Sequence, residues 1–349
     1  MNYSFYENKR ASFNNPDNLS TDFDEVINYH QAMSQYQVTP LYSWTDFAKY
    51  YQIKAMYIKD EAYRFNLNAF KGLGVSYALR NLKEKNPVLV ACTDGNHGKA
   101  LAWMGMINHY QVIIFMPEGS EVRRVKAIEK YGAKVYVTKM NYDDTVRYAD
   151  DFAKKHHYHL IQDTIIGDNT KIVKDIMLGY ITLINEALSQ MEEKPTHVFI
   201  QAGVGSLAGG IIWYLANQNF DIPYIGVIEA DCCPCIYESI KNNQNCSIKG
   251  NPQTIMAGLN CGEANSIALK LIGAYATWLI KCQDQITIQG MNRAKNPIGN
   301  DQKFSAGESG AVGLGLAERI LKENREIFKI DHNSVILVIN SEGELQDEK

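Results

Sequence analysis

The stretch "PVLVACTDGNHGKALAWMGMINHYQVIIFM", residues 87–116, places a helical segment between two short apolar runs. "PVLVACT" and "QVIIFM" have the length of buried strands, and "GNHGKALAWMGMIN" has the length of a helix. A strand, a helix and a strand in this order predict a βαβ unit with parallel strands. Further runs of the same kind follow at 134–138, 158–162, 196–202, 224–230 and 334–340. We therefore expect an α/β fold, with parallel twisted sheets covered by helices on both faces.

The chain has 349 residues, of which 46% are hydrophobic, enough apolar material for two domain-sized cores. The alternation that starts near residue 86 predicts a small inserted α/β domain over 86–165. Residues 1–85 and 166–349 are then expected to form a large cofactor-binding domain, with the active site between the two. Residues 1 to about 38, rich in Asn, Asp and Ser, are expected to wrap the surface.

A formal net charge of -4 and scattered basic residues provide no positive stripe for a phosphate backbone, so nucleic acid is not an expected partner. No apolar run approaches the roughly 18 residues of a membrane span, and no signal peptide opens the chain. The segment "NSIALKLIGAYATWLIK" (265–281) is interpreted as one core helix. We expect a soluble, cytoplasmic protein with no membrane association.

The seven cysteines are expected to be reduced thiols, because a cytoplasmic chain of this length needs no disulfide staples. The cluster "CCPC" (232–235) lacks a second cysteine or histidine pair at zinc spacing, so no metal site is expected. Whether Cys235 and Cys261 pair stays open.

The glycine-rich segment "QAGVGSLAGG" (201–210) lies between an apolar strand and an apolar helix. Backbone N–H groups and the positive end of a helix dipole make such a turn an anion site. Two interpretations stay open at this point. The loop is typical of a phosphate cradle, but Gly203-x-Gly205-x-x-Ala208 with Glu229 at the end of the next strand also fits a dinucleotide fingerprint. A NAD-binding oxidoreductase or a dinucleotide-binding module is therefore an alternative.

A single lysine stands out in "RFNLNAFKGLGVSYALRNLK" (64–83), a segment interpreted as an amphipathic helix. Lys71 is flanked by Phe70, Gly72 and other apolar or small residues. An amine in an apolar turn is desolvated, which disfavours its charged form and suits a Schiff-base nucleophile that later acts as a base.

Polar residues follow two other strands, where ligands bind in open α/β folds. In "TDGNHG" (93–98), Asp94 is a carboxylate placed for proton transfer and Asn96 is a hydrogen-bond donor for a phenolate or carboxylate. Asp163 ends the apolar run "HLIQDT" and suits the binding of a distal ammonium, or alternatively the capping of a helix. A dehydrogenase explains neither Lys71 nor this loop, whereas a pyridoxal-phosphate enzyme needs a lysine, a phosphate cradle and groups around the pyridine ring.

Taken together, these blocks resemble the fold-type II pyridoxal-phosphate enzymes, the group of threonine dehydratase and the tryptophan synthase β-subunit. The resemblance extends over most of the chain and rests on "YRFNLNAFKGLG" (63–74), "TDGNHG" (93–98), "NYDDTVR" (141–147), "QDT" (162–164), "QAGVGSLAGG" (201–210), "TIMAGLNCGE" (254–263), "GESGAVGLG" (307–315) and "NSEGE" (340–344). Related dehydratases carry serine where this chain has Asp94. In this respect the chain is most similar to the subgroup that acts on 2,3-diaminopropionate.

The resemblance implies that Lys71 binds pyridoxal 5'-phosphate covalently, that Asn96 holds the ring oxygen and that Ser341 hydrogen-bonds the pyridine nitrogen. It implies a phosphate cradle formed by Gly203, Val204, Gly205, Ser206 and Leu207. It leaves the role of Glu308, including a possible monovalent cation, undecided.

The implied activity is that of a carbon–nitrogen lyase, which eliminates ammonia from an amino-acid substrate, 2,3-diaminopropionate, to give pyruvate and ammonia. Lys71 would serve as the base for the L-isomer and Asp94 for the D-isomer. A serine or threonine dehydratase is the alternative within the family, although a neutral hydroxyl leaving group has no obvious need for both Asp94 and Asp163. The resemblance also implies a homodimer.

Overall fold

The computed structural model describes residues 2–9, 21–93, 95–166, 169–218, 220–221, 223–250 and 252–345. Its strands are β1 (Tyr3–Glu7), β2 (Leu41–Ser43), β3 (Ala55–Asp60), β4 (Val88–Cys92), β5 (Gln111–Met116), β6 (Lys134–Val137), β7 (His159–Leu160), β8 (His197–Gln201), β9 (Tyr224–Ala230), β10 (Trp278–Cys282) and β11 (Val335–Asn340). The α-helices are α1 (Phe23–Gln31), α2 (Thr45–Tyr51), α3 (Lys71–Leu79), α4 (Asn96–Asn108), α5 (Val122–Glu129), α6 (Tyr142–His156), α7 (Thr170–Gly179), α8 (Ile181–Gln190), α9 (Ser206–Ala216), α10 (Cys235–Asn242), α11 (Ser266–Tyr275), α12 (Asp284–Lys295) and α13 (Val312–Glu323). Short 3-10 helices η1 (Glu61–Asn66) and η2 (Ala257–Leu259) complete the order.

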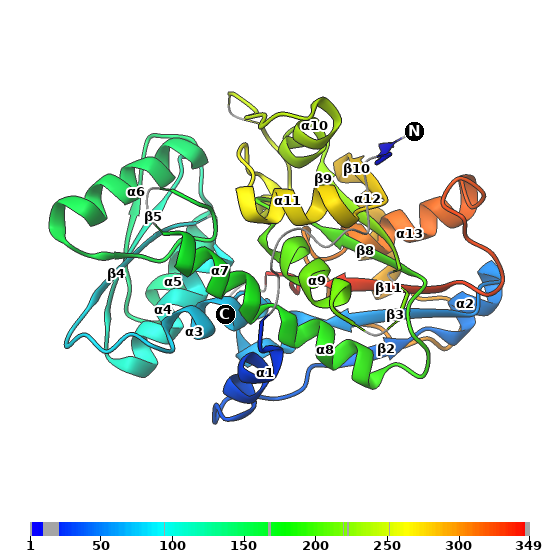
Figure 1. Cartoon of the computed structure of the whole chain (residues 1–349), viewed down its shortest axis with the longest axis horizontal. Coiled ribbons are helices and arrows are strands. Elements are labelled where there is room, and N and C mark those ends of the chain that lie inside the picture. Colours follow the sequence, from blue (N-terminus) through cyan, green and yellow to red (C-terminus); the bar gives the residue numbers. More distant parts are fainter. Residues whose placement is uncertain are drawn as a thin grey trace.

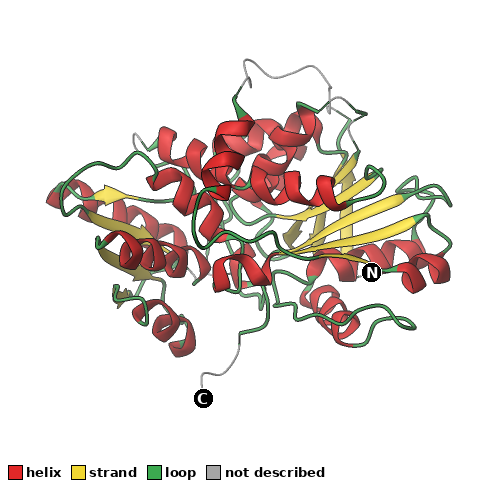
Figure 2. Ribbon diagram, turned by 90° about the horizontal axis from the view of Figure 1, so that it is seen from below, coloured by secondary structure: helices red, strands yellow, loops and turns green. Residues whose placement is uncertain are grey.

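The strands form two sheets, which lie at opposite sides of the molecule in Figure 1. The larger sheet has the order β1-β10-β9-β8-β11-β3-β2, in which only the two edge strands β1 and β2 run antiparallel to their neighbours. The smaller sheet, β6-β5-β4-β7, is entirely parallel. Figure 2 shows helices on either side of the larger sheet. The predicted α/β fold class is confirmed, and the smaller sheet lies wholly between Val88 and Leu160.

Helix α3 is buried among other helices, and the prediction of an amphipathic helix over 64–83 is wrong. The helix begins at Lys71 and ends at Leu79, and every residue after Lys71 in it is buried. It packs against α1, α4 and α7, so no side of it faces water along its length. A helix covered on all sides needs no polar face, and this covering is a tertiary effect absent from the local sequence.

Residues 265–281 were predicted as one helix, and this prediction is also wrong. Helix α11 ends at Tyr275, Ala276 adopts extended backbone angles (φ -69°, ψ 130°), and Trp278–Cys282 forms the strand β10. Strand β10 lies inside the larger sheet, between β1 and β9. An aromatic residue followed by branched residues fits such a pleated, buried surface well.

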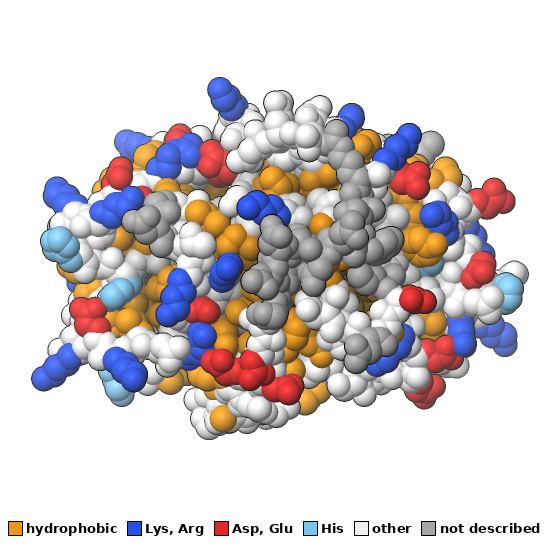
Figure 3. All heavy atoms as spheres, in the orientation of Figure 1, with side chains coloured by type: hydrophobic (Ala, Val, Ile, Leu, Met, Phe, Trp, Pro, Cys, Tyr) orange, Lys and Arg blue, Asp and Glu red, His pale blue; other side chains and the backbone are white. Residues whose placement is uncertain are grey.

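The N-terminal segment contributes more to the core than predicted. Tyr3 in β1 is buried, as are Val26 and His30 in α1. On the outside, the face in Figure 3 shows Lys and Arg side chains interspersed with Asp and Glu. Within the described part of the chain, no helix is long and apolar enough to cross a membrane.

Candidate active site

A cavity with an empty volume of about 740 Å³ lies where residues from both sheets meet. From the smaller-sheet side it is lined by residues that follow β4 and by others on α5 and α6; from the larger sheet it is lined by residues that follow β8 and β11. The predicted site residues that line it are Lys71, Asn96, Asp163, Gly203, Val204, Gly205, Ser206, Leu207 and Ser341. Asp94 lies outside the described residues, although Thr93 and Gly95 on either side of it line the cavity. Folding therefore brings together residues that are up to 270 positions apart, from Lys71 to Ser341.

Lys71, the first residue of α3, forms an ion pair with Asp163, with Nζ 2.5 Å from Oδ2. Burial by itself lowers the pKa of Lys71, but the carboxylate of Asp163 and the neighbouring Tyr180 outweigh burial, so the pKa is raised. Lys71 is desolvated as expected, but its charged form is favoured rather than disfavoured. The reason is a partner 92 positions away, which nothing near Lys71 in the sequence reveals.

Asp163 is buried and serves as the anion of this pair rather than as a helix cap. Burial alone raises its pKa, but the positive charge of Lys71 outweighs this effect, so the pKa of Asp163 is lowered. Its second oxygen, Oδ1, is buried without a hydrogen-bond partner among the described residues. One oxygen of this carboxylate is thus engaged in the ion pair, and the other is available to a further hydrogen-bond donor.

The segment Gly203–Leu207 turns from β8 into α9, as the sequence predicts. Gly205 has φ +95°, a left-handed conformation that favours glycine, and it directly precedes the first helical residue. A Cβ on Gly203 would lie 2.5 Å from the Gly258 carbonyl oxygen, so the turn is packed too closely for a side chain there. Ser206 Oγ donates to the Asp163 carbonyl at 2.6 Å and accepts from Asn265 at 2.9 Å. The result is a rigid helix N-terminus that opens on the cavity, suited to a phosphate.

Glu229, the acidic residue that would bind a ribose in the dinucleotide-binding alternative, instead hydrogen-bonds to the protein backbone. It is buried, and its two carboxylate oxygens accept from the backbone N–H groups of Ile236 (2.8 Å) and Tyr237 (2.6 Å). Burial raises the pKa of Glu229 to about 8. A carboxyl group that caps the first turn of α10 in this way is not presented to a ribose.

Two residues near the predicted ring-binding groups were missed from the sequence. Gln201 donates to Ser341 Oγ at 2.8 Å, and its own Oε1 is buried without a partner in the described part of the chain. Glu342 accepts from the Asn96 side chain and, at 2.9 Å, from the backbone N–H of Ser309. Both lie inside motifs that had already been singled out, Gln201 at the start of "QAGVG" and Glu342 in "NSEGE". Their place beside predicted cofactor-binding residues was the sequence signal that could have identified them.

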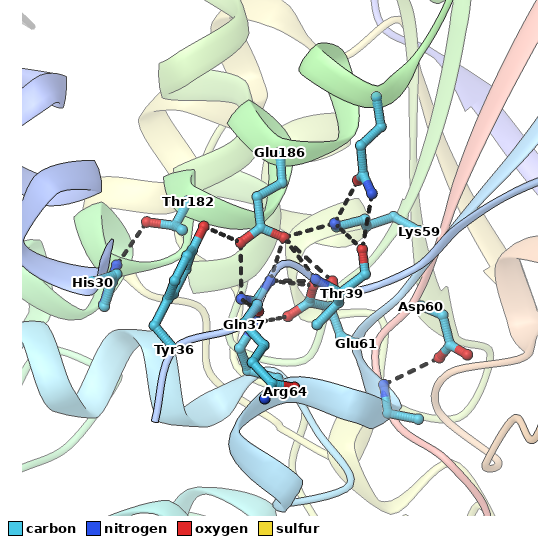
Figure 4. Close-up of polar contacts among 12 residues, drawn as sticks. His30, Tyr36, Gln37, Thr39, Lys59, Asp60, Glu61, Arg64, Thr182 and Glu186 are labelled. Carbon is cyan, nitrogen blue, oxygen red and sulfur yellow. Dashed lines mark hydrogen bonds and ion pairs between the residues drawn. The ribbon is translucent and has the colours of Figure 1, made fainter. Parts of the chain in front are cut away.

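The turn that leads into Lys71 is strained and is held by a buried charge cluster. Phe65, Asn66 and Asn68 have φ values of 52°, 57° and 58°, rare for residues other than glycine. Just before them, Arg64 donates to Glu61 and to Glu186, in the network drawn in Figure 4. We name the set Lys59, Glu61, Arg64 and Glu186 the buried charge cluster.

The remaining predictions concern cysteines and Glu308. The seven cysteines form no disulfide among the described residues, and Cys235 and Cys261 are both buried. Among the described residues there is no cluster of His, Cys, Asp and Glu that would hold a metal ion. The carbonyl of Glu308 accepts a hydrogen bond from the Thr287 hydroxyl, and Glu308 is not among the residues found to line the cavity.

Comparisons with known proteins agree with this geometry. The profile of the family described as "Pyridoxal-phosphate dependent enzyme" matches residues 33–342, so the chain belongs to the pyridoxal-phosphate-dependent enzymes. The diaminopropionate ammonia-lyase of Escherichia coli (strain K12) is 39% identical over 348 residues, covering 90% of this chain and 87% of the relative. That of Salmonella typhimurium (strain LT2) is 35% identical, covering 92% and 88%.

Among solved structures, the Escherichia coli diaminopropionate ammonia-lyase in complex with an aminoacrylate–PLP azomethine reaction intermediate superposes with a TM-score of 0.92. It is 36% identical and the match covers 99% of this chain and 94% of that one. At this identity and coverage, the chain belongs to the family of diaminopropionate ammonia-lyases.

The residues of the cavity fit the cofactor that defines this class. The turn before α9 provides an anion site, Lys71 provides the amine, and Ser341 provides a hydroxyl beside the cavity. Oε1 of Gln201 and Oδ1 of Asp163 are buried polar atoms without a partner among the described residues, so both are available to a bound group.

Proposed function

We propose that this protein eliminates ammonia from 2,3-diaminopropionate and releases pyruvate and ammonia. The observation that carries the proposal is the contact between Lys71 and Asp163 inside the cavity, because it places a base beside a carboxylate suited to a distal ammonium. Membership of the diaminopropionate ammonia-lyase family supports the same reaction.

Pyridoxal phosphate, when bound, supplies an aldehyde for the substrate amine and an electron-withdrawing ring that acidifies the Cα–H bond. We assign its covalent attachment to Lys71, its phosphate to Gly203–Leu207, its ring oxygen to Asn96 and its ring nitrogen to Ser341. Each of these residues lines the cavity.

The chemistry of the chain's own residues follows from their charges. Lys71, once it has given up its proton, takes the Cα proton of the L-isomer. Asp163 pairs with the Cβ ammonium and favours its charged form, so the group departs as neutral ammonia. Asp94, whose neighbours line the cavity, is assigned to the Cα proton of the D-isomer. The enamine that remains is hydrolysed by water to pyruvate and a second ammonia.

The test is a visible absorption spectrum of the protein reconstituted with pyridoxal phosphate, recorded while D- or L-2,3-diaminopropionate is added and pyruvate is assayed. A band that shifts as pyruvate appears supports the proposal. Faster pyruvate formation from serine or threonine than from diaminopropionate would instead favour the dehydratase alternative.

We also propose a two-domain organisation with boundaries near residues 86 and 165, and a homodimer that works in the cytoplasm. Closure of the small domain over the substrate would exclude water before elimination. The absence of disulfides among the described residues is compatible with a reducing compartment. Sedimentation velocity giving twice the chain mass would support the dimer.

A further inference from the structure

Glu342 is a buried acidic residue that lines the active-site cavity, and the proposed reaction gives it no task. Only 6% of the residue is exposed. Its Oε1 accepts a hydrogen bond from the backbone N–H of Ser309 at 2.9 Å, and its Oε2 accepts one from the side-chain Nδ2 of Asn96. Both oxygens are therefore engaged by donors of the cavity wall. One of these donors, Asn96, is the residue assigned to the ring oxygen of the cofactor.

The backbone of Glu342 is fixed against the turn that leads into Lys71. An isolated antiparallel bridge pairs Glu342 with Ala69, two positions before Lys71. The backbone hydrogen bonds on either side of this bridge, donated by Phe70 and Gly343, are both 3.1 Å long. The chain that carries the Glu342 side chain is therefore held in place relative to the lysine.

Asn96 reaches the cavity from the other sheet. It is the first residue of α4 and follows β4 of the smaller sheet, whereas Glu342 follows β11 of the larger sheet. The hydrogen bond between them joins residues 246 positions apart in the sequence. It therefore ties the amide of Asn96 to the side of the cavity that carries Lys71.

A carboxylate decides which way round the amide of Asn96 is held. A side-chain amide has an oxygen that only accepts and an NH₂ group that only donates, and a half-turn exchanges the two. An ionised carboxyl group only accepts, so it holds the NH₂ group and repels the amide oxygen. One N–H of Asn96 then points at Glu342, and the second N–H of the same group is available to another acceptor in the cavity.

We propose that Glu342 is a positioning residue, which holds Asn96 so that this second N–H is directed at the ring oxygen of pyridoxal phosphate. The inference rests on the proposed function only in placing the ring oxygen at Asn96, and it does not depend on the substrate. An N–H donor stabilises the ionised form of the ring oxygen. The cofactor absorbs in the visible when this oxygen is ionised and in the near ultraviolet when it is protonated, so the ratio of the two bands reports the orientation of Asn96.

The test is a double-mutant cycle on this ratio, recorded for purified holoenzymes without substrate and after removal of unbound cofactor. Asn96→Ala is expected to lower the ratio of visible to near-ultraviolet absorbance by about 10-fold. Glu342→Ala frees the amide to turn and is expected to lower it by at least about 3-fold. The double variant should lose no more than Asn96→Ala alone, because Glu342 then has nothing left to position.

Glu344→Ala is the matched control, since it removes a carboxylate two positions further along the same segment. Glu344 pairs with Lys295 at an exposed position, with Nζ 2.5 Å from Oε1, and it does not line the cavity in the described structure. We expect the wild-type ratio for this variant. If Glu342→Ala yields no folded holoenzyme, Glu342→Gln decides. Glutamine offers one accepting oxygen to two N–H donors, so its ratio should lie between those of the wild type and Asn96→Ala.

A wild-type ratio in Glu342→Ala or in Glu342→Gln would overturn the proposal, and so would single losses that multiply in the double variant. A wild-type ratio in Asn96→Ala would refute the placement of the ring oxygen and, with it, the role of Glu342. A loss confined to Asn96→Ala would refute the role of Glu342 alone. A protein that makes no pyruvate from diaminopropionate would refute the proposed reaction, and the cycle would still test Glu342.

Discussion

The buried charge cluster and the active-site cavity are built from the same kinds of side chain, but only the cluster is complete. In the cluster, Lys59 and Arg64 face Glu61 and Glu186, and every one of these side chains has partners at hydrogen-bonding distance (Figure 4). In the cavity, single buried atoms of His97, Asp163 and Gln201 have no hydrogen-bond partner among the described residues.

The difference separates structural from functional polar groups. A buried polar group without a partner costs free energy, so a protein keeps one where a ligand supplies the missing contact. A completed network makes its neighbourhood rigid instead. Here the buried charge cluster directly precedes the strained turn at Phe65–Asn68, which leads into Lys71. The cluster therefore helps to hold the lysine of the cavity in place.

The largest effect is expected from removing the amine of the cavity. Lys71→Ala should lower kcat for diaminopropionate by about 10⁴-fold or more, because it removes both the attachment of the cofactor and a base. The measurement is the rate of pyruvate formation at saturating pyridoxal phosphate. Lys54→Ala, at an exposed ion pair with Glu193, is the control and should retain wild-type activity. A variant that keeps more than a tenth of the activity would contradict the assignment of Lys71.

The next effect tests the cluster. Arg64→Met should lower the free energy of unfolding by about 3–5 kcal/mol, since Glu61 and Glu186 would remain buried without that cation. Urea unfolding of the variant and the wild type measures the difference. Arg147→Met, at an exposed pair with Glu263, should cost less than about 1 kcal/mol. A loss as small as this for Arg64→Met would show that the buried charge cluster contributes little to the stability of the fold.

A smaller, selective effect tests the two bases of the cavity. Asp94→Asn should reduce turnover of D-diaminopropionate by about 100-fold while leaving the L-isomer within about 5-fold. Initial rates of pyruvate formation from each isomer measure the split. Equal losses for the two isomers would refute the assignment of Asp94 to one face.

How much of this comparison the sequence predicts depends on how far apart the partners lie. The alternation of strands and helices is a local pattern, and the cavity residues lie in short motifs at strand ends. Most of the fold class and most of the cavity residues could therefore be predicted from the sequence. The pairs Lys71–Asp163 and Arg64–Glu186 join residues 92 and 122 positions apart. The charge state of Lys71 depends on the first pair and the buried charge cluster on the second, so neither could be predicted from the neighbouring sequence.

The missed elements have the same cause. Helix α3 looks amphipathic until α1, α4 and α7 cover it, and β10 looks like the end of a helix until β1 and β9 flank it. Arg124, a buried residue of α5 that lines the cavity, was likewise missed, because a basic residue in a polar helix gives no sign of burial before the helix is placed.

The smallest effect concerns His30, a buried side chain next to α3 whose ring nitrogens, like the groups of the buried charge cluster, all have partners. His30 is buried, with Nδ1 2.6 Å from Thr182 Oγ1 and Nε2 3.0 Å from the Leu73 carbonyl oxygen. Burial lowers its pKa from 6.5 to about 3. Between these values the unfolded chain binds the proton more readily than the folded protein, so stability is present above pH 6.5 and is lost as the pH falls toward 3.

The expected loss that belongs to His30 is about 1–2 kcal/mol between pH 6.5 and pH 5. It is isolated by subtracting the pH dependence of His30→Gln from that of the wild type, using urea unfolding at each pH. His156→Gln, at an exposed position, should leave the wild-type pH dependence unchanged. If the wild type and His30→Gln lose stability in parallel over this range, His30 is already protonated in the folded protein. The protonated His30 would then be a buried charge that the hydrogen bonds around it do not account for.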